Sequence, residues 1–138
     1  MSGDGRDRAR ERVASARVGR LATVTGDGRP HLVPCCFALD GDRVVTAVDA
    51  KPKATPALRR LDNVRAHPVA SLLVDHYDDD WSRLWWVRVD GRAEVIEHGD
   101  AHESAIDALV AKYDQYRTMR PTGAVIELTE LTWHTWSP

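Results

Sequence analysis

Short apolar runs separated by turn-forming residues are the main pattern along the chain. Alternating or continuous apolar positions of strand length predict six β-strands, because successive side chains of a strand point to opposite faces. We expect these strands over residues 20–25, 31–39, 43–48, 69–75, 84–97 and 124–136. Glycine, aspartate and proline cluster over residues 26–30 and 40–42. These clusters predict tight hairpin turns, since glycine readily adopts positive φ.

Three segments show helical periodicity instead. Residues 4–17 carry one apolar stripe among arginines, which predicts a weakly amphipathic helix. Thr55 and Pro56 form an N-cap and first-turn pair, and this second helix ends before Pro68. Asp100 is the expected N-cap of a third helix, with an acidic residue three positions later as in a capping box.

Two positions predict irregularities within the strands. Pro34 cannot donate a ladder hydrogen bond, so the strand over residues 31–39 should have a bulge or an open edge there. Gly91 predicts a bend or bulge in the strand over residues 84–97. The run over residues 69–75 is almost continuously apolar, which predicts a central strand.

The order of these elements indicates the fold class. Strands joined mostly by tight hairpins, with helices at only three junctions, do not form the alternating pattern of a parallel sheet. We therefore expect a mainly β (α+β) fold, a small antiparallel barrel with peripheral helices. A length of 138 residues suits one domain over residues 1–138, with residues 1–17 forming a helix that packs on the barrel.

Composition and charge exclude several classes of function. Apolar residues make up 43% of the chain and charged residues 29%, as in an ordinary globular protein. A formal charge of −2 gives no support to a nucleic-acid or membrane-surface role. No apolar run approaches the ~20 residues that span a bilayer, and the first residues lack the apolar core of a secretory signal. We expect a cytoplasmic protein.

Cysteines and histidines suggest neither a disulfide nor a metal site. Cys35 and Cys36 are adjacent, so in a strand they point to opposite faces. Neither a Cys-x-x-Cys pair nor a zincin-type pair of histidines is present, because Ile106 stands where His102 would need its partner. No Ser-His-Asp order or paired-carboxylate arrangement stands out either.

Candidate chemistry lies between residues 46 and 86. A strand there leads into a loop with Lys51 and Lys53, and a helix with several arginines follows. Cationic side chains beside a helix N-terminus can hold a phosphate. The same lysines could also be ordinary solvated loop charges. Trp81 can supply a flat apolar wall for a planar ring, although tryptophan is also common in cores and interfaces. This stretch predicts a site for an anionic, flavin-like cofactor.

The order and spacing of several short motifs carry a resemblance to a known family. These are residues 19–24, 27–31, 58–60 and 72–75, then Trp81 and residues 89–95. Together they resemble the pyridoxamine-phosphate-oxidase-like split β-barrel flavin and deazaflavin oxidoreductases. Among these proteins they look most like the branch of probable coenzyme F420-dependent enzymes, and residues 76–86 look like one subgroup of that branch. The resemblance implies a six-stranded split barrel of the FMN-binding type and a homodimer with cofactor sites at its interface.

The resemblance also implies roles for particular residues. Lys51, Lys53, Thr55 and Arg59 would hold the cofactor phosphate and acidic tail. Ala54 stands where the branch commonly has a lysine, so the adjacent Lys53 would substitute for it. The ring would be framed by Val48 and Asp49 through their backbone groups, by Pro34 and Cys36 on its other side, and by Trp81.

The function implied is F420-dependent transfer of hydride between the deazaflavin and a small organic substrate. No side chain has to act as nucleophile or base, because hydride transfer is the chemistry of the cofactor. One alternative is an FMN-dependent oxidoreductase of the same fold. Another is a protein that binds a flavin, deazaflavin or tetrapyrrole without turnover. A heme-binding variant of this barrel exists in the wider family, and His31 or His76 would be the ligand here.

Overall fold

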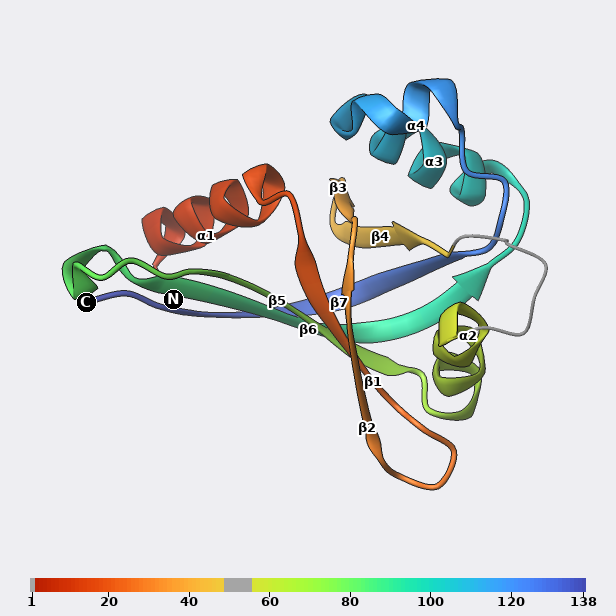
Figure 1. Cartoon of the computed structure of the whole chain (residues 1–138), viewed down its shortest axis with the longest axis horizontal. Helices are drawn as coiled ribbons and strands as arrows, with labels where there is room; N and C mark the ends of the chain where they lie inside the picture. The colour runs from red at the N-terminus through yellow and green to blue at the C-terminus, as the bar shows by residue number, and fades with distance from the viewer. Residues whose placement is uncertain (1, 49–55) are drawn as a thin grey trace.

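The fold was obtained as a computed structural model that describes residues 2–48 and 56–138. Within these residues, seven antiparallel strands form one sheet in the order β2-β1-β5-β6-β7-β4-β3 (Figure 1). The strands are β1 (Gly19–Val24), β2 (Pro30–Cys35), β3 (Ala38–Asp40), β4 (Arg43–Ala47), β5 (Val69–His76), β6 (Trp85–Ile96) and β7 (Val125–Trp136). The mainly β, antiparallel architecture is confirmed.

The count of seven strands, instead of the six expected, comes from a break in one predicted strand. The run over residues 31–39 divides into β2, which ends at Cys35, and β3, which begins at Ala38. These two strands are the opposite edges of the sheet, yet only two residues join them. The sheet must therefore curl until its edges meet, which makes the half-barrel of a split-barrel fold.

The two expected irregularities are placed clearly. Pro34 lies in the edge strand β2, whose register with β1 is unbroken, so the open edge is confirmed and no bulge is present. At Gly91 the register of β6 with β7 shifts, so an irregularity lies where it was expected. The one extra residue of this bulge belongs to β7, where residues 130 and 131 together oppose Gly91, and Glu130 has a φ of 51°.

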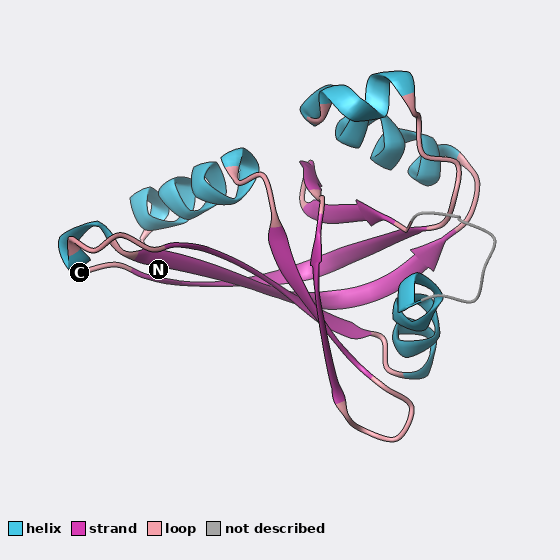
Figure 2. Ribbon diagram, viewed as in Figure 1, coloured by secondary structure: helices cyan, strands magenta, loops and turns pink. Residues whose placement is uncertain are grey.

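Helices close the barrel and cover part of the sheet (Figure 2). They are α1 (Gly3–Ser15), α2 (Pro56–Ala66), the 3-10 turn η1 (Trp81–Arg83), α3 (Asp100–Lys112) and α4 (Asp114–Thr118). The prediction of Asp100 as N-cap was wrong. Gly99 is the N-cap, with a φ of 98°, and Asp100 is the first helical residue without a side-chain cap. A glycine adopts this left-handed φ at little cost, so the carboxylate is not needed there.

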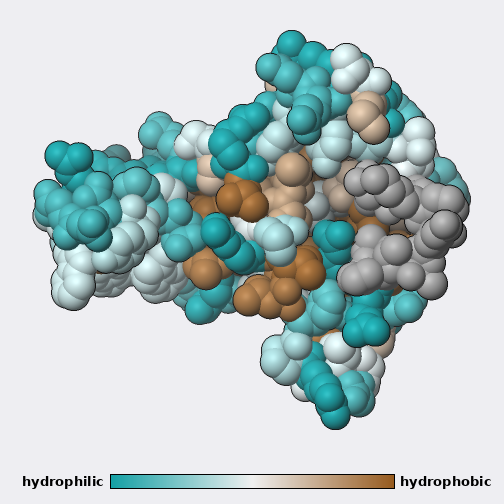
Figure 3. All heavy atoms as spheres, viewed as in Figure 1, coloured by the Kyte–Doolittle hydropathy of each residue, from teal (hydrophilic) through white to brown (hydrophobic). Residues whose placement is uncertain are grey.

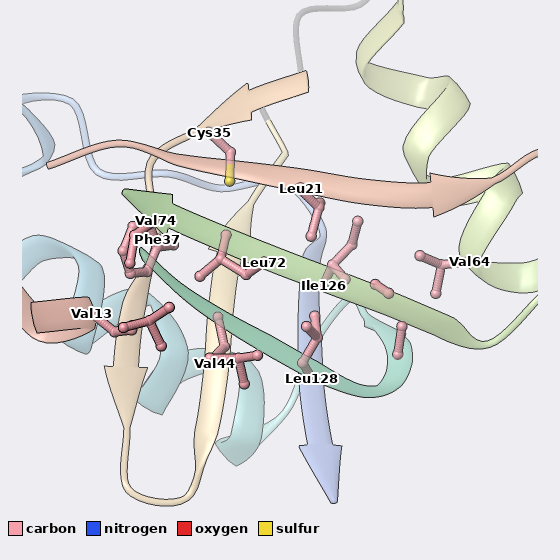
Figure 4. Packing of buried hydrophobic residues seen from close by; sticks show 14 of the residues in the cluster. Val13, Leu21, Cys35, Phe37, Val44, Val64, Leu72, Val74, Ile126 and Leu128 are labelled. Atoms are coloured by element: carbon pink, nitrogen blue, oxygen red, sulfur yellow. The ribbon is translucent and has the colours of Figure 1, made fainter. Parts of the chain in front are cut away.

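The main core fills the curled inner face of the sheet (Figure 4). Leu21, Leu72 and Leu128 come from three strands, while Val13 of α1 and Val64 of α2 close its ends. A smaller cluster packs α3 on the outside of β3, β4 and β7. The remaining outer face belongs to β2, β1, β5, the first half of β6 and the second half of β7. We call it the open face.

A partly buried ion-pair network fastens α3 to the sheet. Arg43 donates to Asp40 at 2.6 Å, to Glu127 at 2.8 Å and to the carbonyl of Ala101 at 2.7 Å. Burial alone would raise the pKa of Asp40, but hydrogen bonds from Arg43 and Ser104 lower it overall. This network fixes the end of α3 that lies away from Lys112.

None of the helices in the described part of the chain is long and apolar enough to cross a membrane.

Gly91→Ala should destabilise the fold by about 1–3 kcal/mol, because the new Cβ would lie 2.9 Å from the carbonyl oxygen of Thr129. Urea denaturation measures the change. Gly26→Ala is the matched control, since its Cβ meets nothing within 4 Å. Equal loss in both variants would contradict the tight packing at the bulge.

Candidate functional site

The two-residue connection between β2 and β3 is held by side chains instead of strand partners. We call residues 35–37 the β2–β3 corner. Thr46 Oγ1 donates to the carbonyl of Cys36 at 2.6 Å. The Tyr113 hydroxyl accepts from the Phe37 N–H at 3.1 Å, and lies 3.1 Å from the Phe37 carbonyl and 3.0 Å from that of Arg17. These bonds satisfy the backbone where the ladder stops.

The corner carries one buried and one exposed thiol. Cys35 is buried beside Thr46, and Cys36 is exposed. Burial raises the pKa of the Cys35 thiol above its ordinary value, against a hydrogen bond with Thr46 and attraction by Arg60 and Lys112. The corner therefore lies within the electrostatic reach of cations on two different helices, α2 and α3.

Both of these cations have a buried nitrogen without a hydrogen-bond partner. Among the described residues, Arg60 Nε and Lys112 Nζ are two of three such buried side-chain atoms, and His31 Nδ1 is the third. Buried polar atoms are nearly always paired, so unpaired cationic nitrogens need an explanation. They are what a site for an anionic group would show when its ligand is not part of the structure.

The Lys112 ammonium lies 3.8 Å from the centre of the Phe37 ring and 5.3 Å from that of Tyr113. Burial, and then repulsion by Arg17, lower the pKa of Lys112 to about 8. Arg17 is tied to the same unit, because it donates to the carbonyl of Lys112 at 3.0 Å and lies over the Tyr113 ring at 4.7 Å. The α3 side of the corner therefore holds two neighbouring cations.

The structure brings some of the predicted site residues to this corner. Pro34 and Cys36 are both exposed, and they lie at the edge of β2 and in the corner itself. Val48, at the end of β4, is buried, and its N–H donates to the carbonyl of Ala124 at 2.9 Å. The Val48 N–H is therefore already bonded within the chain. Asp49, Lys51, Lys53 and Thr55 lie outside the described residues.

On α2 the two neighbouring arginines point in different directions. Arg59 is exposed, whereas Arg60 is half-buried and acts on Cys35. Arg60 and Lys112 were not among the site residues expected from the sequence. Consecutive arginines on a helix indicate that at most one turns inward, but sequence alone does not say which. No sequence pattern distinguishes Lys112 from a surface lysine.

Trp81 is not brought to the corner within one chain. It lies in η1 and its side chain is 69% exposed. β5 separates α2 from η1, and its 8 residues span roughly 26 Å. Figure 1 shows α2 and η1 at opposite ends of the molecule. Trp81 therefore cannot meet Arg59 or Arg60 of its own chain.

The described residues contain no group of three or more histidine, cysteine, aspartate or glutamate side chains placed to hold a metal ion. His102 is buried and lies 2.8 Å from the carbonyl of Gly123, which is a structural contact. His76 stacks on Trp85 at 6.0 Å, and His31 is half-buried on the inner face of β2.

Two grooves lie away from the corner. One, of about 670 Å³, is on the open face and is lined by residues such as Ala22, Ser71 and Asp90. The other, of about 600 Å³, lies between α2 and the end of β6 and includes Arg65 and Glu97, which form an ion pair at 2.8 Å. Apolar side chains also gather at the centre of one face (Figure 3). An exposed apolar area of this kind suits ligand or partner binding.

Lys112→Met should change how stability depends on pH. The folded pKa of about 8 lies below the ordinary 10.5, so the unfolded chain binds more protons between these values. The free energy of unfolding of the wild type should therefore rise relative to the variant between pH 8 and 10.5, and this contribution is lost as the pH falls through 8. Urea denaturation at several pH values measures the difference. Parallel profiles for the two proteins would contradict the buried ammonium.

Comparisons with known proteins agree on the architecture. The conserved hypothetical protein Rv2991 of Mycobacterium tuberculosis is 23% identical, with a TM-score of 0.77 over 99% of this chain and 85% of that one. A heme binding protein of Mycobacterium smegmatis is 21% identical, with a TM-score of 0.73 over 99% of this chain and 59% of that one. A FAD-binding protein of Mesorhizobium loti is 22% identical, with a TM-score of 0.66 over 98% and 92%.

At these identities the solved structures establish a shared split-barrel fold. The family of the chain is shown by a match to a family model. The model described as pyridoxamine 5'-phosphate oxidase matches residues 6–137, which is nearly the whole chain. The chain belongs to the pyridoxamine 5'-phosphate oxidase family.

Proposed function

We propose that the protein is a homodimeric oxidoreductase that binds coenzyme F420 at the β2–β3 corner and passes hydride between its deazaflavin ring and a small organic substrate. The observation that carries the proposal is the buried, unpartnered Nε of Arg60, which acts on Cys35 in the corner that also carries the exposed Cys36. Cations held in this way favour an anionic ligand, and F420 is a phosphorylated, acidic cofactor.

Different residues of the chain would hold the phosphate and the acidic tail of the cofactor. Arg60 turns toward the corner, so it is suited to the phosphate, together with Lys51, Lys53 and Thr55 of the preceding segment. Arg59 is exposed on the same helix and is suited to the acidic tail, which extends toward solvent. An arginine fork can donate two parallel hydrogen bonds to one phosphate, whereas a lysine acts as a point charge without that fixed geometry.

The ring would lie against Pro34 and Cys36, with the backbone of Val48 and Asp49 at its edge. A bound deazaflavin supplies the hydride chemistry. The residues around the corner would orient the ring, exclude water from it and favour negative charge at its edge. Under this proposal the cofactor supplies the chemistry and the protein supplies the positioning, so no side chain has to act as a nucleophile.

FMN is the second candidate cofactor. It also carries a phosphate and a planar ring, and one structural neighbour is described as a FAD-binding protein. A third reading is binding without turnover, because another neighbour is described as a heme binding protein. The unpartnered Nδ1 of His31 could serve such a ligand, but its ring belongs to the inner face of β2, beside Thr23. The corner cations favour a phosphate-bearing ligand over a tetrapyrrole.

Two observations support the homodimer. Leu32 and Val69 are 66% and 53% exposed on the open face, where no helix covers them. Trp81, expected near the ring, is separated from α2 of its own chain by the length of β5. A two-fold dimer would let the η1 turn of one subunit reach the corner of the other. The acidic residues 78–80 would then approach the basic helix α2, with complementary charge.

The cofactor assignment predicts the outcome of a titration. Addition of F420 should quench the tryptophan fluorescence of the purified protein. Arg60→Met should weaken the affinity for F420 by about tenfold or more. The double variant Lys51→Ala, Lys53→Ala should also weaken the affinity for F420 by about tenfold or more. Arg65→Met is the matched control on α2, because Arg65 pairs with Glu97 and does not face the corner.

Three results would redirect the proposal. Binding of FMN with no response to F420 would select the second cofactor. Tight binding without turnover across a broad panel of acceptors would select a carrier protein. Unchanged F420 affinity in both the Arg60 and the double-lysine variants would remove the phosphate site from this corner.

The dimer predicts a separate result. Leu32→Asp should convert the protein to a monomer in sedimentation experiments at micromolar concentration, because it places a charge in the apolar part of the interface. It should not unfold the chain, since Leu32 is exposed within one subunit. Met119→Asp is the control, at a residue that is 75% exposed beyond α4. Loss of association in both variants, or in neither, would contradict an interface on the open face.

A further inference from the structure

Lys112 and Arg17 form a feature that cofactor binding on the α2 side of the corner does not explain. Lys112 ends α3, and Arg17 lies in the link between α1 and β1. The guanidinium of Arg17 bonds to the Lys112 carbonyl at 3.0 Å, and both cations lie on the Tyr113 ring. Repulsion by Arg17 contributes to the lowered pKa of Lys112, so the two charges act on each other directly.

This arrangement places like charges together without a counter-ion. Among the described residues, neither Lys112 nor Arg17 forms an ion pair with a carboxylate, whereas arginines elsewhere, such as Arg43 and Arg88, are paired with acids. Contact with Phe37 and Tyr113 offsets part of the repulsion, since aromatic faces attract cations. A partly buried cation held beside another one, with no acid, is a common arrangement at sites that bind anions.

The position of the pair relates it to the proposed ring site. Phe37, which carries the Lys112 ammonium on its face, directly follows the exposed Cys36. Arg60 approaches the same corner from α2, on the side of the expected phosphate loop. The α3 side is therefore left for a second anionic group close to the ring wall.

We propose that Lys112 and Arg17 form the subsite for the carboxylate of the substrate, which would be a small organic acid bound beside Cys36. This inference rests on the proposed function, because only an oxidoreductase would have the bound acid as its substrate. The subsite itself is built from residues of this chain alone. The Lys112 side chain has four rotatable bonds and can turn its ammonium from the Phe37 face to a bound carboxylate. Arg17 is exposed and presents a planar fork that matches a carboxylate.

The charged and titratable groups that face Lys112 determine how binding depends on pH. They are Arg17, Cys35, Cys36 and Tyr113. Burial raises the pKa of the Cys35 thiol and of the Tyr113 phenol, so these two groups become anionic only at high pH, where they would repel a carboxylate. Neutralisation of Lys112 would remove the charge that attracts the carboxylate. Replacing Lys112 by arginine separates these effects, because an arginine stays charged throughout the range.

Calorimetric titration with benzoate, and with benzyl alcohol as its neutral analogue, tests the subsite in the protein both with and without added F420. At pH 7, Lys112→Met should weaken benzoate binding by about tenfold or more and leave any binding of benzyl alcohol unchanged. Lys112→Arg should restore the affinity and should lose less of it than the wild type between pH 7 and 9.5. Arg117→Met, an exposed cation paired with Asp114, is the control and should match the wild type.

Several outcomes would overturn the subsite. They are equal benzoate affinity in the wild type and Lys112→Met, no benzoate binding in either form of the protein, or inorganic phosphate binding more tightly than benzoate. Benzoate binding that depends on Lys112 in a protein that fails to bind F420 or FMN would support the subsite while refuting the proposed cofactor. F420 binding without benzoate binding would support the proposed cofactor while refuting the subsite.

Discussion

The hydrogen bonds that replace the strand ladder at the β2–β3 corner are the constraint on which the rest depends. Thr46 and Tyr113 satisfy the backbone of Cys36 and Phe37, so the chain can leave one edge of the sheet and begin the other within two residues. Without these bonds, polar backbone groups would be buried unpaired at the point where the sheet curls. The half-barrel and the corner are therefore one structural feature.

This closure also determines where charge can collect. The corner lies between the helices α2 and α3, and each contributes a cation whose buried nitrogen has no partner among the described residues. The core inside the curled sheet is buried, and on the outer side α3 packs on β3, β4 and part of β7. What remains is an open face adjoining the corner, which is where a second subunit would complete a ligand site. Fold closure and the proposed cofactor site would thus share the residues of the corner, and the proposed interface would adjoin them.

Features with local chemistry could be predicted from the sequence. The bulge at Gly91 and the edge position of Pro34 follow from the conformational limits of single residues, and both are present. The break after Cys35 could not be predicted, because residues 35–37 contain no glycine or proline. It depends on Tyr113, which is 76 positions from Phe37 in the chain. Likewise, Asp100 has the right chemistry for an N-cap, but the backbone conformation of its neighbour decided the helix start.

The candidate site could be predicted only in part, for the same reason. A motif shows which residue types lie near one another in the chain, but the direction of a side chain depends on packing. Arg59 and Arg60 are adjacent, and only the structure shows that Arg60 turns inward. Lys112 reaches the corner through the packing of α3, which no local pattern encodes. Trp81 is far from the corner of its own chain, so its proposed place at the ring depends on the proposed second subunit.

A crystal structure of the protein with F420 would test the central claim most directly, namely that the corner between α2 and α3 holds an anionic redox cofactor. The account predicts the ring against Pro34 and Cys36 of one subunit, the phosphate beside Arg60, and Trp81 of the partner subunit at the ring. Electron density for the ring in the groove lined by Ala22, Ser71 and Asp90, or in the groove beside Glu97, with the corner left without ligand, would contradict it.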